Sequence, residues 1–475
     1  MTTYSLTLRE DHEAALRAHM LRGDGLEHAA YVLCCRAAIR RDPWDREAHE
    51  KFLSVQVIPV PDDQVLDAGP GLITWSTASF VRALRAAAGE DQIVAVVHNH
   101  PAGMVAFSAQ DDRNEPDLVQ LAVNRNGEGT KILSLILTGD GQWAGRAWLL
   151  PKPGAHAPLR MVRVLGGRGR YALHYPGRGF AAGLPAFQRQ ALAFGQALND
   201  DLSRLRVGIV GCGGTGSAVA MLLARLGVGQ VALFDNDIVD CTNLNRLHGA
   251  RQQDADLMRS KVYVVAEAIA AMGLGVRVVP VEAWIGDPEC RDALRACDIV
   301  FGCTDDHDGR FFLNRLAYYY LIPVIDVGLA IDVGEGDPPA LRGLDGRVTV
   351  LAPHETCLMC RAVVSGEAAR SEAMKRAEPE LYERRKAEAY VDSGGNPAPA
   401  VVTFTTEVAC MAVNEMIQRL QGFRGPDGAV AHRIRKFHLG EDRRPRHDPR
   451  PACPVCAAGD VWGRGDTDPF LGRMA

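Results

Sequence analysis

Apolar and polar positions along the first third of the chain change between the strand period and the helix period, which indicates a mixed α/β domain. Short apolar runs predict buried strands at 30–35, 51–59, 92–97 and 131–138. Apolar residues recur at helical spacing over 13–21 and 76–88. The run Pro151-Lys152-Pro153-Gly154 then breaks the pattern. We therefore expect a first domain over residues 1–155 and a linker over 156–182.

From residue 205 onward the pattern becomes strand, glycine-rich loop, helix and strand. This βαβ unit covers 206–210, 211–216, 218–226 and 230–235, and it implies a parallel sheet. Further strands are predicted at 276–281, 299–302 and 323–326, the first of them at a sheet edge because it contains Arg277 and Pro280. We expect a second α/β domain over 183–460, with a surface helix or crossing loop at 368–389 and a C-terminal tail over 461–475.

Composition and charge narrow the functional class. The chain has 475 residues, 47% of them hydrophobic and 23% charged, which is typical of a globular protein with two or three domains. Its net charge of -5 argues against general binding of nucleic acid, which needs a basic excess. The N-terminus has no secretion pattern, and no apolar run is long enough to span a membrane. We expect a cytoplasmic protein that binds neither nucleic acid nor membrane.

The first candidate site follows the predicted strand at 92–97. His98 and His100 are two residues apart in an extended segment, so both imidazoles can reach one metal ion. Asp111 can supply a third ligand, and a catalytic zinc needs about three ligands and one open position for water. Ser108 could hydrogen-bond an oxyanion, and Glu27, just before a buried strand, is the best candidate for the general base. A lone H-x-H pair would more often be structural.

This set of residues resembles the JAMM (JAB/MPN) metallo-isopeptidases over roughly residues 5–150. The resemblance rests on H-x-H-P, a serine and an aspartate at matching offsets, and an upstream glutamate. It implies a JAB/MPN α/β zinc hydrolase that cleaves after the C-terminal glycine of ubiquitin-like proteins. It implies His98, His100 and Asp111 as zinc ligands, Ser108 as oxyanion helper and Glu27 as base. The glycine that usually follows the glutamate by a few residues is absent, and Glu13, Glu47 and Glu50 are weaker candidates for the base.

The second candidate site is the loop Gly211-Cys212-Gly213-Gly214-Thr215-Gly216, which follows a strand and opens a helix. Such a loop binds phosphate through backbone N–H groups and the helix dipole, and Asp235 ends the next strand where a carboxylate can bind ribose. This pattern alone favours an NAD-dependent dehydrogenase. Arg246, Lys261 and Asp305 favour another reaction, because they suit a triphosphate and Mg²⁺, which hydride transfer does not need.

The ordered set resembles the ThiF/MoeB and ubiquitin-activating-enzyme family over roughly 183–460. Members adenylate the C-terminal glycine of a ubiquitin-like protein with ATP, on a Rossmann-like ThiF-type fold. The resemblance implies that Gly211, Gly213 and Gly216 shape the loop and that Asp235 binds ribose. It also implies that the phosphates are bound by Asn243, Arg246 and Lys261, and that Asp305 holds Mg²⁺. Arg189 matches an arginine that reaches the ATP of the partner subunit, which implies a homodimer. Leu247 and Asp306 depart from the usual Gln and Asn.

Two C-x-x-C pairs stand 96 residues apart, at Cys357 and Cys360 and at Cys453 and Cys456. Four thiolates form a closed structural zinc site, which here would tie the C-terminal tail to the second domain. A redox role is the alternative. Members of the family that form a thioester carry a cysteine between the first pair and the last helix, and residues 361–400 contain none. Cys410 is expected to be buried on an apolar helix and Cys303 to pack at a strand end.

The combination predicts a bifunctional enzyme with the cofactors ATP, Mg²⁺ and Zn²⁺. Its second domain would adenylate a ubiquitin-like protein, and its first domain would trim that protein's precursor or remove it from targets. The alternative is activation of a sulfur-carrier protein, with the peptidase maturing the carrier. A scaffold with a decayed peptidase is a third interpretation, and the intact ligand set counts against it. The expected partners are the ubiquitin-like or sulfur-carrier protein, a second copy of the chain and, for protein conjugation, a conjugating enzyme.

Overall fold

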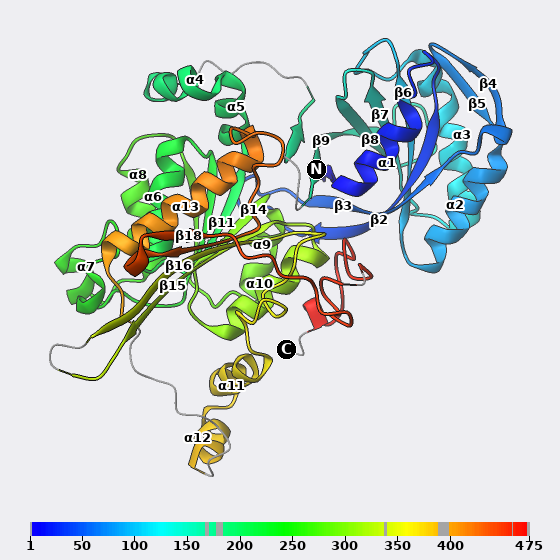
Figure 1. Cartoon of the computed structure of the whole chain (residues 1–475). Helices are drawn as coiled ribbons and strands as arrows, with labels where there is room; N and C mark the ends of the chain where they lie inside the picture. Colours follow the sequence, from blue (N-terminus) through cyan, green and yellow to red (C-terminus); the bar gives the residue numbers. More distant parts are fainter. Residues whose placement is uncertain are drawn as a thin grey trace.

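The computed structural model describes residues 2–166, 171–176, 184–336, 340–387, 399–457 and 459–472. Two eight-stranded sheets organise the chain, one in each half of the sequence (Figure 1). The fold class predicted from the sequence is confirmed: both halves are α/β, and the second sheet is mainly parallel. In the described part of the chain, no helix combines the length and the apolar character needed to cross a membrane.

The first sheet has the order β1-β3-β2-β6-β7-β8-β9-β10, and β1 also pairs with β9, so the sheet closes on itself. Its strands are β1 Thr3–Arg9, β2 Ala29–Ile39, β3 His49–Pro59, β6 Ile93–His100, β7 Ile132–Thr138, β8 Trp143–Trp148, β9 His156–Leu165 and β10 Ala172–His174. The helices are α1 Glu10–Met20, α2 Thr77–Gly89 and α3 Ala109–Asn126. A small hairpin, β4 Val65–Gly69 and β5 Leu72–Trp75, lies outside this sheet and follows the 3₁₀ helix η1 Asp62–Gln64.

Alternating residues of the first sheet pack on opposite faces, as the period of a strand requires. In β2, Ala30 and Val32 join the apolar cluster that contains Leu16 of α1. Tyr31 and Leu33 join the cluster on the other face, which contains residues of α2 and α3. Both apolar clusters pack against β2 and β6, which lie in the middle of the sheet. This packing holds the end of β6, where His98 and His100 lie, in a fixed position.

The segment 156–182, which the sequence analysis assigns to a linker, supplies part of this sheet. Residues 156–165 form β9 between β8 and β1, and 172–174 form β10. The strand escaped notice because its alternation is interrupted by Arg160 and Arg163. Arg163 is nevertheless buried, since its guanidinium pairs with Asp298 of the second domain at 3.0 Å. Residues 167–170 and 177–183 of the expected linker lie outside the described residues.

The second sheet has the order β13-β12-β11-β14-β15-β16-β17-β18. Neighbours from β13 to β15 run parallel and those from β15 to β18 antiparallel, and β13 is the edge strand that the sequence predicts. The strands are β11 Arg206–Val210, β12 Gln230–Phe234, β13 Arg277–Val281, β14 Ile299–Gly302, β15 Val324–Val333, β16 Leu341–Leu351, β17 His432–Lys436 and β18 Glu441–Arg443.

The helices of this half follow the strands in the order of a doubly wound fold. They are α4 Gln188–Phe194, α5 Gln196–Arg204, α6 Gly214–Leu226, α7 Gln252–Asp256, α8 Lys261–Ala270, α9 Arg291–Ala296, α10 His307–Tyr319, α11 Gly366–Ala377, α12 Pro379–Ala387 and α13 Val402–Gln421. Short 3₁₀ helices are η2 Pro185–Phe187, η3 Cys241–Asn243, η4 Pro288–Cys290, η5 Phe437–Leu439 and η6 Phe470–Gly472. The charged segment expected at 368–389 forms α11 and α12 as far as residue 387.

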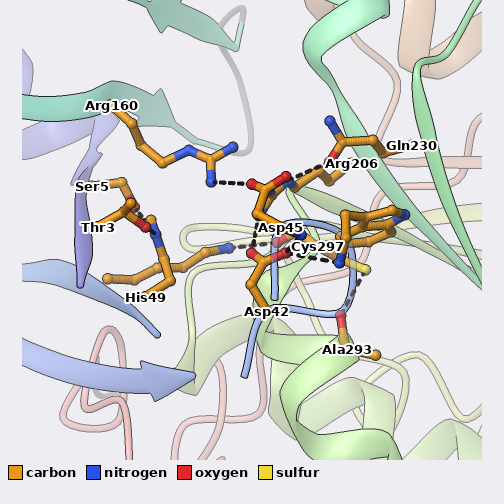
Figure 2. A network of polar contacts seen from close by, with 12 residues as sticks. Thr3, Ser5, Asp42, Asp45, His49, Arg160, Arg206, Gln230, Ala293 and Cys297 are labelled. Atoms are coloured by element: carbon orange, nitrogen blue, oxygen red, sulfur yellow. Dashed lines mark hydrogen bonds and ion pairs between the residues drawn. The ribbon is translucent and has the colours of Figure 1, made fainter. Parts of the chain in front are cut away.

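The two halves share one apolar core and a buried polar interface. Ile39, Trp44 and Leu53 of the first half belong to the same cluster as Val207 and Leu294 of the second. Figure 2 shows the polar network beside this core, in which the guanidinium of Arg206 contacts Asp42 and Asp45. The ammonium of Lys51 donates a hydrogen bond to the carbonyl oxygen of Cys297 at 2.7 Å. Because charged and apolar contacts both cross the boundary, the halves form one folded unit.

The C-terminal tail is a third part of this interface. The backbone N–H of Gly463 donates to the carbonyl oxygen of Tyr318 in α10, at 2.9 Å. Three residues further on, the N–H of Asp466 donates to the carbonyl oxygen of Arg36 in β2, and its carboxylate accepts the N–H of Ala38 at 2.6 Å. The tail, red in Figure 1, therefore crosses from the second half to the first.

Candidate active sites

The end of β6 brings three metal-ligating side chains together. The Nε2 atoms of His98 and His100 lie 3.0 Å apart, on the same face of the strand. Asp111, in the first turn of α3, places Oδ1 3.5 Å from the Nε2 atom of His98. The ligand atoms of all three residues lie within 4.8 Å of one another. Tetrahedral zinc with bonds of about 2.0–2.1 Å to nitrogen and oxygen needs ligand atoms roughly 3.3 Å apart. The three residues therefore fit a zinc ion.

Burial and hydrogen bonding hold both imidazoles in the form that binds a metal. Burial lowers the pKa of His98 to about 4, so its ring is neutral at pH 7. The Nδ1–H of His100 donates to the carbonyl oxygen of Met104 at 2.8 Å. That contact leaves Nε2 of His100 with its lone pair directed at the other ligands.

Ser108 fixes the carboxylate of Asp111. It is the N-cap of α3, and its Oγ accepts the backbone N–H of Asp111 at 3.2 Å. Its own backbone N–H donates to Oδ2 of Asp111 at 2.6 Å, which directs the other carboxylate oxygen toward His98. The sequence analysis expects Ser108 to be an oxyanion helper and does not anticipate this capping role. Since Oγ acts as an acceptor in the cap, its hydroxyl hydrogen can still donate to a substrate.

Glu27 lies in the same cavity as the three ligands. The cavity has a volume of about 130 Å³, and Leu72, Ile73 and Trp75 of the β4–β5 hairpin form an apolar wall. Glu27 itself is 5% exposed. Burial and then the charge of Asp111 raise the pKa of its carboxyl group to about 7. A carboxylate with a pKa near neutrality is suited to general acid–base chemistry.

The glycine loop after β11 shapes a second cavity, of about 440 Å³. Gly211 has a φ of +87°, and a Cβ there would meet the carbonyl oxygen of Cys303 at 2.8 Å. A Cβ on Gly216 would lie 1.8 Å from the carbonyl oxygen of Gly211, so α6 could not approach the loop. Among the described residues, no atom lies within 4 Å of a Cβ on Gly213, which is the N-cap of α6 and faces open space. The N-terminus of α6 can therefore accept an anion.

The charged residues expected around a nucleotide line this cavity. Asp235 accepts the backbone N–H groups of Cys212 at 2.6 Å and Asp237 at 2.8 Å, and burial raises its pKa. Lys261 pairs with Asp237 at 2.7 Å. The cavity is also lined by Asn243, by Arg246, whose guanidinium donates to the carbonyl oxygen of Thr242, and by the exposed Asp305. The structure thus brings together all the residues predicted for ribose, phosphates and Mg²⁺, and their charges fit a nucleotide triphosphate with its metal.

Three further residues line the nucleotide cavity and were missed in the sequence. Trp284 follows the edge strand β13, Arg310 lies in α10, and Arg376 lies in α11. The guanidinium of Arg376 lies 3.5 Å from the centre of a Trp284 ring and pairs with Asp308 at 2.7 Å. Position after a strand is a signal that could have found Trp284. No sequence signal connects Arg376 with the glycine loop, because it arrives from a segment folded over the cavity.

The two departures from the family pattern have structural explanations. Leu247 is buried and belongs to the apolar core of this half. Asp306 is the N-cap of α10 and accepts the backbone N–H of Gly309 at 2.9 Å. Asp and Asn cap helices about equally well, so the change at 306 preserves the helix start.

Arg189 is exposed on α4, and it is absent from the described residues that line the nucleotide cavity of its own chain. A contribution to the neighbour's site remains a prediction.

The two C-x-x-C pairs converge. The Sγ atoms of Cys357 and Cys453 are 3.7 Å apart, and so are those of Cys360 and Cys456. All four lie within 4.8 Å of one another. Tetrahedral zinc with bonds of about 2.3 Å to sulfur places the sulfur atoms roughly 3.8 Å apart, so the four thiols fit a structural zinc ion.

Cys303 and Cys410, the two other cysteines that the sequence analysis considers, are poor nucleophiles. Cys303 lines the cavity, but burial raises the pKa of its thiol. Cys410 is half-buried on α13, a smaller degree of burial than the sequence analysis expects, and burial raises its pKa as well. A raised pKa lowers the fraction of reactive thiolate.

The fold and the two cavities define a two-domain α/β protein with a candidate metal site in its first domain and a candidate nucleotide site in its second. A model of the ThiF family matches residues 187–457, and a model of the prokaryotic homologs of the JAB domain matches residues 9–150. The chain belongs to the ThiF family and carries a JAB-type domain before its ThiF domain. This is the fusion that the sequence resemblances predict.

Individual relatives match parts of the second domain. The molybdopterin-synthase adenylyltransferase of Salmonella typhimurium is 33% identical over 170 residues, which are 35% of this chain and 62% of that protein. The SAMP-activating enzyme E1 of Haloferax volcanii is 28% identical over 155 residues, 33% of this chain and 52% of that protein. The matches thus span less than two thirds of either relative. A crystal structure of E. coli MccB with succinimide covers 58% of this chain and 75% of its own, at 18% identity and a TM-score of 0.44.

Proposed function

We propose that the second domain uses ATP to adenylate the C-terminal glycine of a ubiquitin-like protein. The observation that carries this proposal is the cavity in which the glycine loop, Asp235, Arg246, Lys261 and Asp305 meet. A hydride-transfer enzyme has no use for two cations and a carboxylate at the phosphates. Family membership supports ATP as the nucleotide, and relatives named molybdopterin-synthase adenylyltransferase and SAMP-activating enzyme support adenylyl transfer as the reaction.

In this reaction an oxygen of the glycine carboxylate attacks the α-phosphorus of ATP, and pyrophosphate leaves. Negative charge grows on the leaving phosphates, and Arg246 and Lys261 stabilise it. Lys261 pairs with Asp237 before the nucleotide arrives, so the ammonium is already held at the cavity wall. Asp305 is the residue that would hold Mg²⁺, and the metal would neutralise part of the charge on the phosphates.

ATP–pyrophosphate exchange tests this assignment. The probes are the ubiquitin-like proteins with a terminal Gly-Gly that the source genome encodes. Exchange should depend on the terminal glycine and fall at least 100-fold in Asp305→Ala. Exchange that does not depend on the terminal glycine, or equal exchange in Asp305→Ala, would overturn the assignment.

We further propose that the first domain is a zinc peptidase that cleaves after this glycine, in precursors or in conjugates. His98, His100 and Asp111 would hold the zinc ion, which would lower the pKa of a water molecule and polarise the peptide carbonyl. Glu27 would take the proton of the attacking water and deliver it to the leaving amine. The proximity of Glu27 to the three ligands in one cavity supports this division of roles. Mass spectrometry of a modifier extended beyond its Gly-Gly should show release of the extension; chelation should abolish this release, and Glu27→Gln should slow it strongly.

A sulfur-carrier activating enzyme is the second candidate. The raised pKa values of Cys303 and Cys410 agree with it, because a raised pKa makes both thiols poor nucleophiles for a thioester. Relatives named adenylyltransferase and sulfurtransferase agree with it. In that case sulfide attacks the carbonyl carbon of the acyl-adenylate, AMP leaves, and a thiocarboxylate forms. In protein conjugation the thiol of a conjugating enzyme attacks instead. Each nucleophile can be added to the adenylated protein, and the mass of the product, measured by mass spectrometry, then distinguishes sulfur transfer from protein conjugation.

A further inference from the structure

Asn99, the residue between the two histidine ligands, contacts the segment that carries Glu27. Its Oδ1 accepts the backbone N–H of His28 at 2.6 Å, and its Nδ2 donates to the carbonyl oxygen of Leu26 at 3.2 Å. Its backbone N–H also donates to the carbonyl oxygen of His28, at 3.3 Å. Asn99 is 1% exposed. The side-chain amide of Asn99 thus forms hydrogen bonds with the backbone on both sides of Glu27.

We propose that Asn99 is a positioning residue that holds Glu27 against the metal ligands. The inference rests on the proposed peptidase function. Residues 26–28 precede β2, which begins at Ala29, so they have few ladder hydrogen bonds of their own. The side chain of Asn99 extends the pairing of β6 with β2 by one more step, beyond the last pair, His98 with Ala29.

A second contact fixes the same segment from the other side. The backbone N–H of Glu27 donates to the carbonyl oxygen of Gly69, at the end of β4. Glu27 is therefore held between the β4–β5 hairpin and β6. Of the hairpin and β6, only β6 also contains His98 and His100. Strand alternation places these two side chains on one face of β6 and Asn99 on the other. The end of β6 therefore determines the distance between Glu27 and the two histidines.

This arrangement gives the middle residue of the motif a chemical requirement. A side chain at 99 must present one acceptor and one donor in the plane of an amide to satisfy His28 and Leu26. Asn meets both needs at this length. Without the amide, Leu26 and His28 lose their side-chain partners, and Glu27 can shift by the fraction of an ångström that general-base catalysis does not tolerate.

The test compares Asn99→Leu, which keeps the shape and removes both hydrogen bonds, with Asn99→Asp, which keeps the acceptor for His28. The full-length zinc-loaded protein cleaves a fluorogenic peptide ending in Gly-Gly-7-amido-4-methylcoumarin. We expect kcat to fall about 100-fold in Asn99→Leu and less in Asn99→Asp, with KM within about twofold. Zinc content and ATP–pyrophosphate exchange should stay unchanged, since neither depends on this amide.

The decisive comparison is made in a Glu27→Gln background. If Asn99 acts through Glu27, Asn99→Leu adds little further loss of kcat there, because the base is already absent. An equal loss in both backgrounds, or loss of zinc with activity, would overturn the positioning role and indicate a merely structural one. If Asn99→Leu folds poorly, Asn99→Asp must show the same dependence on Glu27. Failure of the wild type to cleave, or full cleavage by Glu27→Gln, would instead remove the proposed peptidase function.

Discussion

The buried pair between Arg206 and Asp42 gives a quantitative prediction about how the two domains are joined. Both side chains are almost fully buried, with 3% and 2% exposure. Oδ1 of Asp42 accepts two local backbone N–H groups, of Trp44 and Asp45, at 3.0 Å each. Oδ2 faces the guanidinium of Arg206. In Asp42→Asn the local turn is preserved, while a neutral donor replaces the oxygen opposite Arg206.

The size of the expected loss of stability follows from the burial of the Arg206–Asp42 pair. Breaking a buried ion pair by removing one partner costs about 3–5 kcal/mol, because the other charge is left uncompensated. Arg206 retains a second carboxylate, Asp45 at 2.5 Å, whose side chain is 36% exposed. We therefore expect a loss near the lower end, about 3 kcal/mol in the free energy of unfolding, or roughly 100-fold in the equilibrium constant. Asp45→Asn is the matched control and should cost about 1 kcal/mol or less, since solvent screens that pair.

Urea unfolding followed by tryptophan fluorescence measures both variants under identical conditions. The Asp42→Asn midpoint should lie well below that of Asp45→Asn. Adding Arg206→Met to Asp42→Asn should recover part of the loss, because it removes the unpaired charge. Equal effects of the two aspartates, or a further loss on removing Arg206, would refute the view that burial makes this pair the sensitive one.

Three other predictions concern the metals, the dimer and pH. The protein should bind about two zinc ions, and the His98→Ala, His100→Ala double variant should keep only the ion held tightly by thiolates; unchanged metal content would contradict the assignment. An Arg189→Ala subunit mixed with an Asp305→Ala subunit should recover part of the exchange activity, and no recovery between subunits that do exchange would exclude a role of Arg189 in trans. Burial lowers the pKa of His49 to about 2, so this side chain stays unprotonated in the folded state at pH values where the unfolded state binds a proton. His49 alone should therefore lower stability by about 1.4 kcal/mol per unit as pH drops below about 6.5. His49→Gln should make the measured dependence shallower by that amount in urea titrations between pH 6.5 and 4, and the buried His12 and His432, whose pKa values are also lowered, should keep part of it.

The parts of each site that are close in sequence could be predicted, since local geometry follows from strand and helix periods. H-x-H at a strand end places two imidazoles on one face, and the serine three residues before Asp111 begins a helix. The glycine loop and Asp235 follow from the βαβ unit in the same way. Matching residues to families then connected the local motifs into sites.

Tertiary contacts explain what could not be predicted. From the sequence alone, Arg163 is expected to be a solvent-exposed residue that interrupts a strand. Its ion-pair partner, Asp298, is 135 residues away along the chain, so local patterns do not indicate this pair. Arg376 reaches the nucleotide cavity from a helix that the sequence analysis treats only as a charged surface segment. Asn99 has no motif of its own, because its role depends on the backbone of residues 71 and 73 positions earlier.

The central claim is that one chain both exposes and activates the terminal glycine of a ubiquitin-like protein. The most direct measurement is ATP–pyrophosphate exchange driven by a modifier precursor that carries extra residues after its Gly-Gly. The wild type should support exchange with precursor and with mature modifier, and Glu27→Gln should support it with the mature form alone. Asp305→Ala should support neither while still trimming the precursor. Exchange with the precursor in Glu27→Gln, or none with the mature modifier in the wild type, would contradict the account.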